Sequence, residues 1–256
     1  MFPVLFKIGK WSIYTYGLFV ALGTIVAILL VEREAKKLGQ DHEQIMDLCV
    51  YLLVAAIVDS RLFYIFSNPK LFLSDPLEIF RIWNGGLVFY GGFVTALIAA
   101  ILYLKGKKIS LFSTADIIAP PLALGHFFGR LGCLFAGCCY GKATALPWAI
   151  TFANTESLAP LGLSLHPTQL YAAINNMLIF VVLWFFRSRK KFAGQIFWIY
   201  VLLYGAARSF IEIYRGDFRG VLIFGVLSIS QVIAAAMTVM AVVMLIVLHR
   251  NENILD

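Results

Sequence analysis

Long apolar runs constrain this chain more than any other feature of its sequence. Between Trp11 and Val31 there is no charged residue and most side chains are apolar, and several runs of similar length follow. A helix of about 20 such residues crosses the hydrocarbon core of a bilayer. Only 14% of the residues are charged and 61% are hydrophobic, whereas about 25% of a soluble domain is charged. The sequence therefore predicts an all-α integral membrane protein.

Seven transmembrane helices are expected, at about residues 12–32, 45–66, 86–104, 114–137, 168–186, 194–214 and 224–248. The first run is too long for the apolar part of a cleavable signal peptide, so we expect it to remain as the first span. Alternate connections place eleven Lys and Arg residues on one side of the membrane and seven on the other. Because cytoplasmic loops carry the excess of positive charge, the N-terminus is expected outside and the C-terminus in the cytoplasm.

A single polytopic membrane domain, residues 1–256, is expected, because no repeat or linker divides the sequence. The longest connection, about residues 139–167, has the length of a functional lid or an interfacial segment. The net charge of +7 comes from basic residues in short connections. There they act as topology signals and contacts for anionic headgroups, so no nucleic-acid partner is expected.

Several charged residues fall inside or at the edges of the expected spans. They are Asp59, Arg61, Asp116, Arg130, Arg208 and Glu212. A charge at the centre of a spanning helix costs about 2.5–3.5 kcal/mol unless it has a partner or a wet cavity. Either these residues pair with one another and lock the helices together, or they line a polar chamber. Their number favours the chamber.

The segment "GRLGCLFAGCCYGK", residues 129–142, places Arg130 among glycine and apolar residues. A guanidinium group is a planar fork of donors that fits a phosphate, and lipid headgroups supply phosphates at this depth. Arg130 is therefore a candidate anchor for a phosphodiester. The structural alternative is an ion pair with Asp116 or Glu212. Gly125 and Gly129 have the GxxxG spacing of closely packed helices.

Cys133, Cys138 and Cys139 lie in the same segment, and three roles are open for them. They are small packing residues, or two of them form a disulfide in an oxidising compartment, or they bind a metal. The spacing C-x4-C-C matches no common zinc pattern, so we expect no metal. Cys49 is alone in the second expected span and is interpreted as a packing residue.

Three further segments carry candidate residues. In "NGGLVFYGG", residues 84–92, the glycines either pack helices closely or contact a ligand. In "HPTQLY", residues 166–171, His166 is either a general base or part of a helix cap around Pro167 and Thr168. In "RSFIEIYR", residues 208–215, Arg208, Glu212 and Arg215 are expected to form one stripe of a helix, with Glu212 holding the arginines in position.

These segments occur together, and in the same order along the chain, in bacterial prolipoprotein diacylglyceryl transferases. The chain resembles that family over nearly its whole length. The flanking segments "YTYGLFVALG" and "LSISQV" are similar as well. The resemblance implies seven spans with the N-terminus outside and the C-terminus inside. It also implies an enzyme of lipoprotein biogenesis in the bacterial plasma (inner) membrane.

The implied reaction moves a diacylglyceryl group from phosphatidylglycerol to the lipobox cysteine thiol of a preprolipoprotein, and glycerol phosphate leaves. Its partners are phosphatidylglycerol, lipobox signal peptides and membrane lipids, with no cofactor and no metal. On this chain the resemblance makes Arg130, Arg208, His166 and Tyr90 the catalytic candidates. The substrate-binding candidates are Tyr16, Arg130, Arg208, Glu212, Arg215, Gly85, Gly86, Gly91 and Gly92.

The chain departs from the family pattern at three positions. Cys133 and Cys138 stand where the family usually has an asparagine and a glutamate, and Tyr90 stands where many members have a histidine. Two other functions are carried as alternatives. One is a membrane thiol-disulfide oxidoreductase or redox sensor that uses the three cysteines, and the other is a non-catalytic phospholipid-binding protein.

Overall fold

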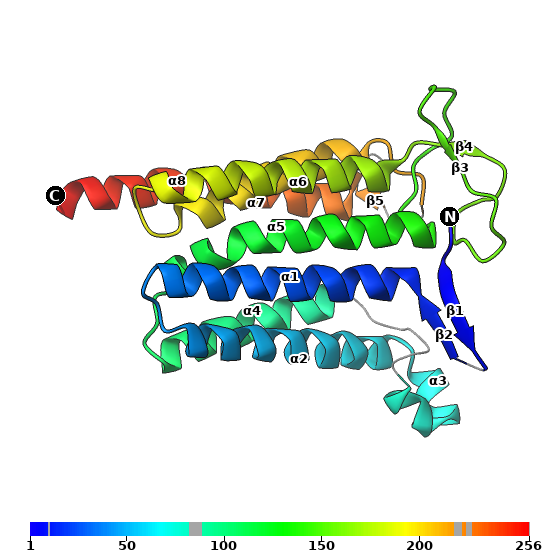
Figure 1. Ribbon diagram of the computed structural model, residues 1–256, viewed down its shortest axis with the longest axis horizontal. Helices are drawn as coiled ribbons and strands as arrows, with labels where there is room; N and C mark the ends of the chain where they lie inside the picture. Colours follow the sequence, from blue (N-terminus) through cyan, green and yellow to red (C-terminus); the bar gives the residue numbers. More distant parts are fainter. Residues whose placement is uncertain (10, 82–88, 218–221, 224–226, 256) are drawn as a thin grey trace. The chain divides into compact units, whose positions relative to one another are not determined.

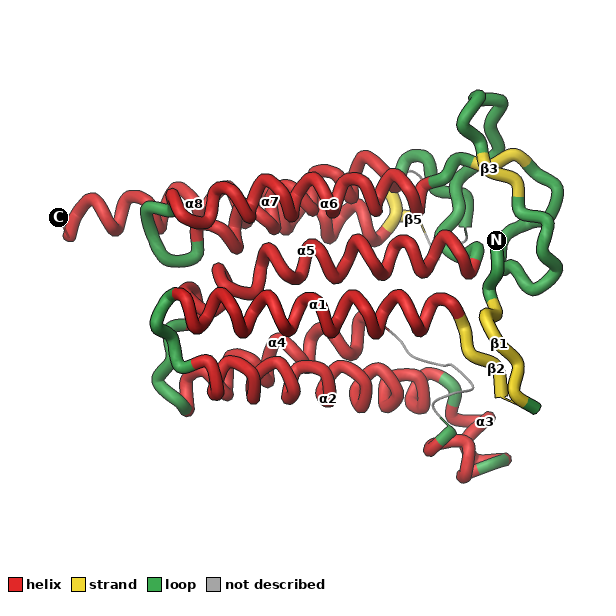
Figure 2. The backbone as a smooth tube through the Cα atoms, in the orientation of Figure 1, coloured by secondary structure: helices red, strands yellow, loops and turns green. Residues whose placement is uncertain are grey.

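Helices make up most of the chain. The computed structural model describes residues 1–9, 11–81, 89–217, 222–223 and 227–255 (Figures 1 and 2). The helices are α1 (Thr15–Lys37), α2 (His42–Ser67), α3 (Pro69–Ser74), α4 (Phe89–Gly106), α5 (Leu111–Ala136), α6 (Thr168–Phe186), α7 (Gln195–Glu212) and α8 (Ile229–Leu255), with the short 3-10 helices η1 (Pro76–Phe80) and η3 (Arg187–Arg189). Three antiparallel pairs join β1 (Val4–Ile8) to β2 (Trp11–Tyr14), β3 (Ile150–Thr151) to β4 (Ser164–Leu165), and β5 (Leu222–Ile223) to β6 (Leu227–Ser228).

Within the described residues, five helical segments are long and apolar enough to cross a membrane. They are Thr15–Lys37, His42–Ser67, Leu111–Ala136, Thr168–Arg189 and Ile229–Arg250. Many of their large apolar side chains are exposed, among them Leu22, Ile25, Val54, Ile57 and Val243. Exposed apolar faces of this size mark a surface that lipid covers. The chain is therefore a helical membrane protein, as expected. The other two expected spans overlap α4 and α7.

The chain forms two compact units, residues 1–30 with 115–256, and residues 31–114. In the first unit, α7 packs against α6 and α8, and α1 runs beside α5 (Figure 1). The close approach of α1 and α5 depends on glycine. A Cβ on Gly23 would lie 2.7 Å from Cβ of Phe128, and one on Gly132 would lie 3.2 Å from Cβ of Phe19. The expected GxxxG pair does not account for this approach, because a Cβ on Gly125 would make only ordinary contacts at 3.8 Å or more and one on Gly129 would meet open space.

One end of the first unit holds the N-terminal hairpin β1–β2 and the long connection between α5 and α6 (Figure 1). Lys7 in β1 forms an ion pair with Glu156 in that connection. The amide of Asn154 also donates to the Met1 carbonyl at 3.3 Å. The N-terminus and the connection therefore lie at the same end of the helices.

Asp116 lies at the opposite end of this unit, beside the first residues of α7. Its carboxylate accepts hydrogen bonds from the backbone N–H groups of Gly194 at 2.8 Å and Phe197 at 2.9 Å, and it pairs with Lys190 at 3.2 Å. Since the first N–H groups of a helix have no partner within the helix, this carboxylate caps α7. Asp116 is thus a structural residue and does not line a polar chamber.

The second unit contains α2, α3, η1 and α4, with α2 packed against α4. Arg61 of α2 is buried, donates to backbone carbonyls of Glu78 and Ile79, and lies over the ring of Phe72 at 5.4 Å. Asp59 accepts a hydrogen bond from Thr95 at 2.6 Å. Both charged residues are therefore partnered within this unit and hold its helices together.

Candidate functional site

A buried ion pair near the end of α7 fixes one of the candidate arginines. The Nη2 atom of Arg208 lies 2.7 Å from Oε2 of Glu212, one helical turn later. The other oxygen of Glu212 accepts the hydroxyl of Ser228 at 3.1 Å. The side chain of Glu212 is only 3% exposed. Glu212 was expected to hold both Arg208 and Arg215, and the ion pair with Arg208 is present.

Arg215 does not continue this helical stripe, because α7 ends at Glu212. Its backbone forms a bridge with Gly141 instead. Its Nε and Nη2 atoms donate to the two carboxylate oxygens of Asp217, at 2.8 Å each. Asp217 was not among the residues expected from the sequence. In the sequence, Asp217 is only a carboxylate two residues after an arginine, and this arrangement is too common to predict a buried ion pair.

Arg130 lies on α5 and is partly buried. Its neighbours include Tyr204, Cys133 and Cys139. In the described part of the chain no carboxylate lies within ion-pair distance of Arg130, since Asp116 caps α7 and Glu212 holds Arg208. The expected structural pair is therefore absent there, and the guanidinium keeps donors for an anionic ligand.

The three guanidinium groups act on one another electrostatically. Arg208 lies within reach of the charges of both Arg130 and Arg215, and Tyr204 lies close to Arg208 as well as Arg130. Two carboxylates, Glu212 and Asp217, pair with this group. Among the described residues this cluster holds three cations and two anions, which is the electrostatic character of an anion site. Tyr204 was missed from the sequence, although it lies four residues before Arg208 on α7.

Tyr16 marks the α1 side of this region. It lies beside Arg130 and the three cysteines, and its side chain is 45% exposed. A Cβ on Gly132 of α5 would lie 3.2 Å from the Tyr16 ring, so the glycine makes room for it.

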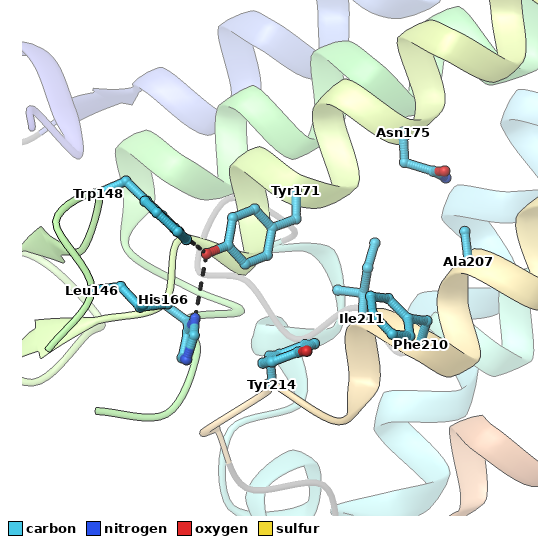
Figure 3. Close-up of a pocket in the computed structure, with 9 residues that line it drawn as sticks. All are labelled: Leu146, Trp148, His166, Tyr171, Asn175, Ala207, Phe210, Ile211 and Tyr214. Carbon is cyan, nitrogen blue, oxygen red and sulfur yellow. Dashed lines mark hydrogen bonds between the residues drawn. The ribbon is translucent and has the colours of Figure 1, made fainter. Parts of the chain in front are cut away.

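A pocket of about 520 Å³ opens between the long connection, α6 and the end of α7 (Figure 3). Its lining residues are mostly apolar or aromatic: Leu146, Trp148, His166, Tyr171, Asn175, Ala207, Phe210, Ile211 and Tyr214. Tyr171 links two of them, because its hydroxyl accepts the indole N–H of Trp148 at 2.8 Å and lies 3.3 Å from Nδ1 of His166. The ring centroids of His166 and Tyr214 are 5.1 Å apart. The pocket thus combines an apolar wall with one positioned imidazole.

The "HPTQLY" segment does more than begin a helix. Pro167 is the N-cap residue of α6, and its side chain makes no cap hydrogen bond. Thr168 and Gln169 instead donate to the carbonyls of Cys139 at 2.7 Å and Cys138 at 2.8 Å. The segment therefore fixes the turn after α5.

That turn brings the three cysteines together. Their sulfur atoms all lie within 4.8 Å of one another. Gly137 and Cys139 both have positive φ, at 77° and 62°, which reverses the chain at the end of α5. Hydrogen bonds with Cys133 and Cys138 lower the pKa of the Cys139 thiol, and the charges of Arg215 and Arg130 act in the same direction. All three thiols are free.

The remaining candidates lie in or near the second unit's α4. Tyr90, Gly91 and Gly92 belong to its first turn. Gly85 and Gly86 lie outside the described residues.

Comparison with known proteins identifies the family. A family model described as prolipoprotein diacylglyceryl transferase matches residues 3–247. A protein of Clostridium tetani named phosphatidylglycerol–prolipoprotein diacylglyceryl transferase is 38% identical over 91% of this chain and 92% of its own length. Proteins with the same name from Oleidesulfovibrio alaskensis and Geobacter sulfurreducens are 35% and 33% identical, each over 98% of this chain and 94% and 96% of their own lengths. The chain belongs to the prolipoprotein diacylglyceryl transferase family.

Proposed function

We propose that the chain transfers a diacylglyceryl group from phosphatidylglycerol to the lipobox cysteine thiol of a preprolipoprotein. The family and the names of its relatives support this assignment. The structural observation that carries it is the group of three arginines with Arg130 left without a described carboxylate partner. An unpaired guanidinium in a membrane protein calls for an anionic ligand, and the phosphodiester of the lipid is one.

The reaction increases the negative charge on the leaving phosphate, which the arginines would contact. A sulfur–carbon bond forms at the glyceryl carbon and the bond from that carbon to the phosphate oxygen breaks. The departing glycerol phosphate takes the electron pair, so its charge rises from about −1 to about −2. Fixed donors aimed at a developing charge lower the barrier because they need no reorganisation. Arg130 and Arg208 would serve this role, with Glu212 and Arg215 maintaining the position of Arg208 and the local charge.

His166 would accept the thiol proton. When its Nδ1–H donates to the Tyr171 hydroxyl oxygen, the other ring nitrogen is left as an acceptor. The hydrogen bond at 3.3 Å and the Trp148 contact on the same oxygen hold the ring in one orientation. The nucleophile belongs to the substrate, so no cysteine of this chain attacks the lipid.

Several further residues would bind the lipid, and one of them, Tyr90, is also a candidate for the chemistry. Tyr16 would line its site, since it lies beside Arg130. Tyr90 and the glycines Gly85, Gly86, Gly91 and Gly92 would contact substrate on the pattern of the family. Tyr90 would also replace the histidine found there in many members.

The topology we infer has seven spans in a bacterial inner membrane, with α4 and α7 added to the five long apolar segments. The N-terminus would be outside and the C-terminus in the cytoplasm. The shared end of the N-terminal hairpin and the 139–167 connection supports this arrangement, because both are then external. A prolipoprotein crossing the membrane would present its lipobox at that end.

The test uses purified protein, phosphatidylglycerol vesicles and a lipobox peptide. It follows glycerol phosphate release and the mass gain of the peptide. Turnover is expected with wild type and with a variant in which all four cysteines are alanine, and none with a peptide whose cysteine is replaced by serine. Binding of phosphatidylglycerol without release of glycerol phosphate would overturn the transferase in favour of a lipid-binding protein.

A further inference from the structure

We propose that Cys133, Cys138 and Cys139 form a binding site for a thiophilic divalent metal ion, of the zinc and cadmium class. The proposed transfer reaction gives these thiols no role. From the spacing C-x4-C-C, which matches no common zinc pattern, no metal site was expected. The folded turn nevertheless brings all three sulfur atoms within 4.8 Å of one another.

The separation of the sulfur atoms suits a shared ion. Zinc–sulfur bonds are about 2.3 Å long, so thiolates around one ion lie roughly 3.8–4.0 Å apart in tetrahedral or trigonal geometry. The three sulfurs are within 4.8 Å before any adjustment. Cys133 is buried and the other two are partly buried, so the site is shielded yet reachable.

The turn that carries the ligands is fixed from several sides. The side chains of Thr168 and Gln169 hold the carbonyls of Cys139 and Cys138. Gly137 has a φ of 77°, and a Cβ there would lie 3.2 Å from the backbone nitrogens of Leu158 and Ala159, so the chain reversal favours glycine. Ligands held in place before binding lose little freedom when the ion enters.

Two further observations favour an ion at this place. Arg130 and Arg215 lie within electrostatic reach of Cys139, and their positive charges offset the net negative charge of three thiolates around a divalent ion. The buried side-chain oxygen of Gln169 has no hydrogen-bond partner among the described residues. The nitrogen of the same amide donates to the Cys138 carbonyl, so this unpartnered oxygen lies beside the turn, where a water molecule brought in with the ion would satisfy it.

Binding needs no redox partner. Each thiol gives its proton to solvent as its sulfur donates an electron pair to the ion, and the ion keeps its charge state. The product is one ion held by three thiolates, with up to three protons released.

The experiment titrates purified, reduced protein with cadmium chloride and follows the ultraviolet charge-transfer absorption of cadmium–thiolate bonds. Mass spectrometry after alkylation reports which cysteines the ion protects. One ion per chain is expected, with Cys133, Cys138 and Cys139 protected. Replacing a cluster cysteine is expected to weaken binding by more than about 100-fold, because residues that merely orient metal ligands are already worth 10–100-fold.

Cys49 provides the matched control, since it is a partly buried thiol in the other unit. Cys49→Ala should bind cadmium as wild type does, and Cys139→Ala should not. Cys138→Ala is the second variant, and the thermal unfolding of both is compared with wild type so that a misfolded variant is not counted. Absence of cadmium–thiolate absorption in wild type would overturn the proposal. Equal binding by folded Cys138→Ala or Cys139→Ala would do so as well.

Discussion

The buried pair of Arg208 and Glu212 gives a prediction whose size can be worked out. Glu212→Gln keeps the shape of the side chain and removes its charge. In the native protein one oxygen of Glu212 lies 2.7 Å from Arg208 and the other accepts the Ser228 hydroxyl at 3.1 Å. Arg208 is only 14% exposed and faces the charges of Arg130 and Arg215. The variant therefore leaves three neighbouring cations with one fewer compensating charge.

Breaking a buried ion pair by removing one partner costs about 3–5 kcal/mol. For a chain of this length, 1 kcal/mol lowers the melting temperature by about 2–4 °C, so Glu212→Gln should lower it by roughly 6–20 °C. Transfer activity should fall by about 100-fold, since a displacement of about 1 Å in a positioning group has that effect.

The assay compares thermal unfolding in detergent with kcat/KM for lipobox peptide. Glu156→Gln is the matched control, because Glu156 forms an ion pair with Lys7 at the exposed end of the molecule and such pairs contribute little. Its stability and activity should stay close to those of wild type. A Glu212→Gln protein that unfolds at the wild-type temperature and keeps wild-type activity would refute the argument.

Three other changes test separate parts of the account. Gly141→Ala should lower the free energy of unfolding by about 1–3 kcal/mol and reduce transfer, because a Cβ there would lie 2.5 Å from the His166 carbonyl oxygen; unchanged thermal unfolding would contradict this. Asp116→Ala should lower the free energy of unfolding by about 0.5–2 kcal/mol, because α7 loses its cap, but the folded protein should remain active. Folded Asp116→Ala protein without transfer activity would contradict this prediction. Wild type that is loaded with cadmium and freed of excess ion before the peptide is added should transfer more slowly than untreated wild type, whereas Cys139→Ala treated in the same way should not. This result depends on both the proposed transfer and the proposed metal site, and an equal loss of transfer in the two proteins would contradict it.

The sequence predicted the helices well because apolar length is a local property. The run at residues 168–186 coincides with α6, and the run at 12–32 became α1 with boundaries shifted by three and five residues. The pairing of Arg208 with Glu212 was also accessible, because residues four apart share a helical face.

The contacts that the sequence did not predict are those between segments that lie apart along the chain. Arg215 continues the sequence spacing of Arg208 and Glu212, but α7 has already ended at Glu212. The Arg215 side chain therefore pairs with Asp217. The cysteine spacing argues against a metal site, but chain reversal at Gly137 brings the sulfurs together. Asp116 looked like a partner for Arg130 and instead caps a helix distant in sequence. Each outcome follows from tertiary contacts that no local pattern encodes.

In the proposed reaction, Arg130 stabilises the phosphate as it leaves. The most direct measurement is single-turnover release of glycerol phosphate by wild type, Arg130→Lys and Arg130→Ala, with phosphatidylglycerol binding measured separately. We expect release by Arg130→Ala to fall by about 10²–10³-fold, as when one fixed donor to a developing charge is removed. Arg130→Lys should fall between the two, because it keeps the charge and loses the planar fork. Release by folded, lipid-bound Arg130→Ala at close to the wild-type rate would contradict the account.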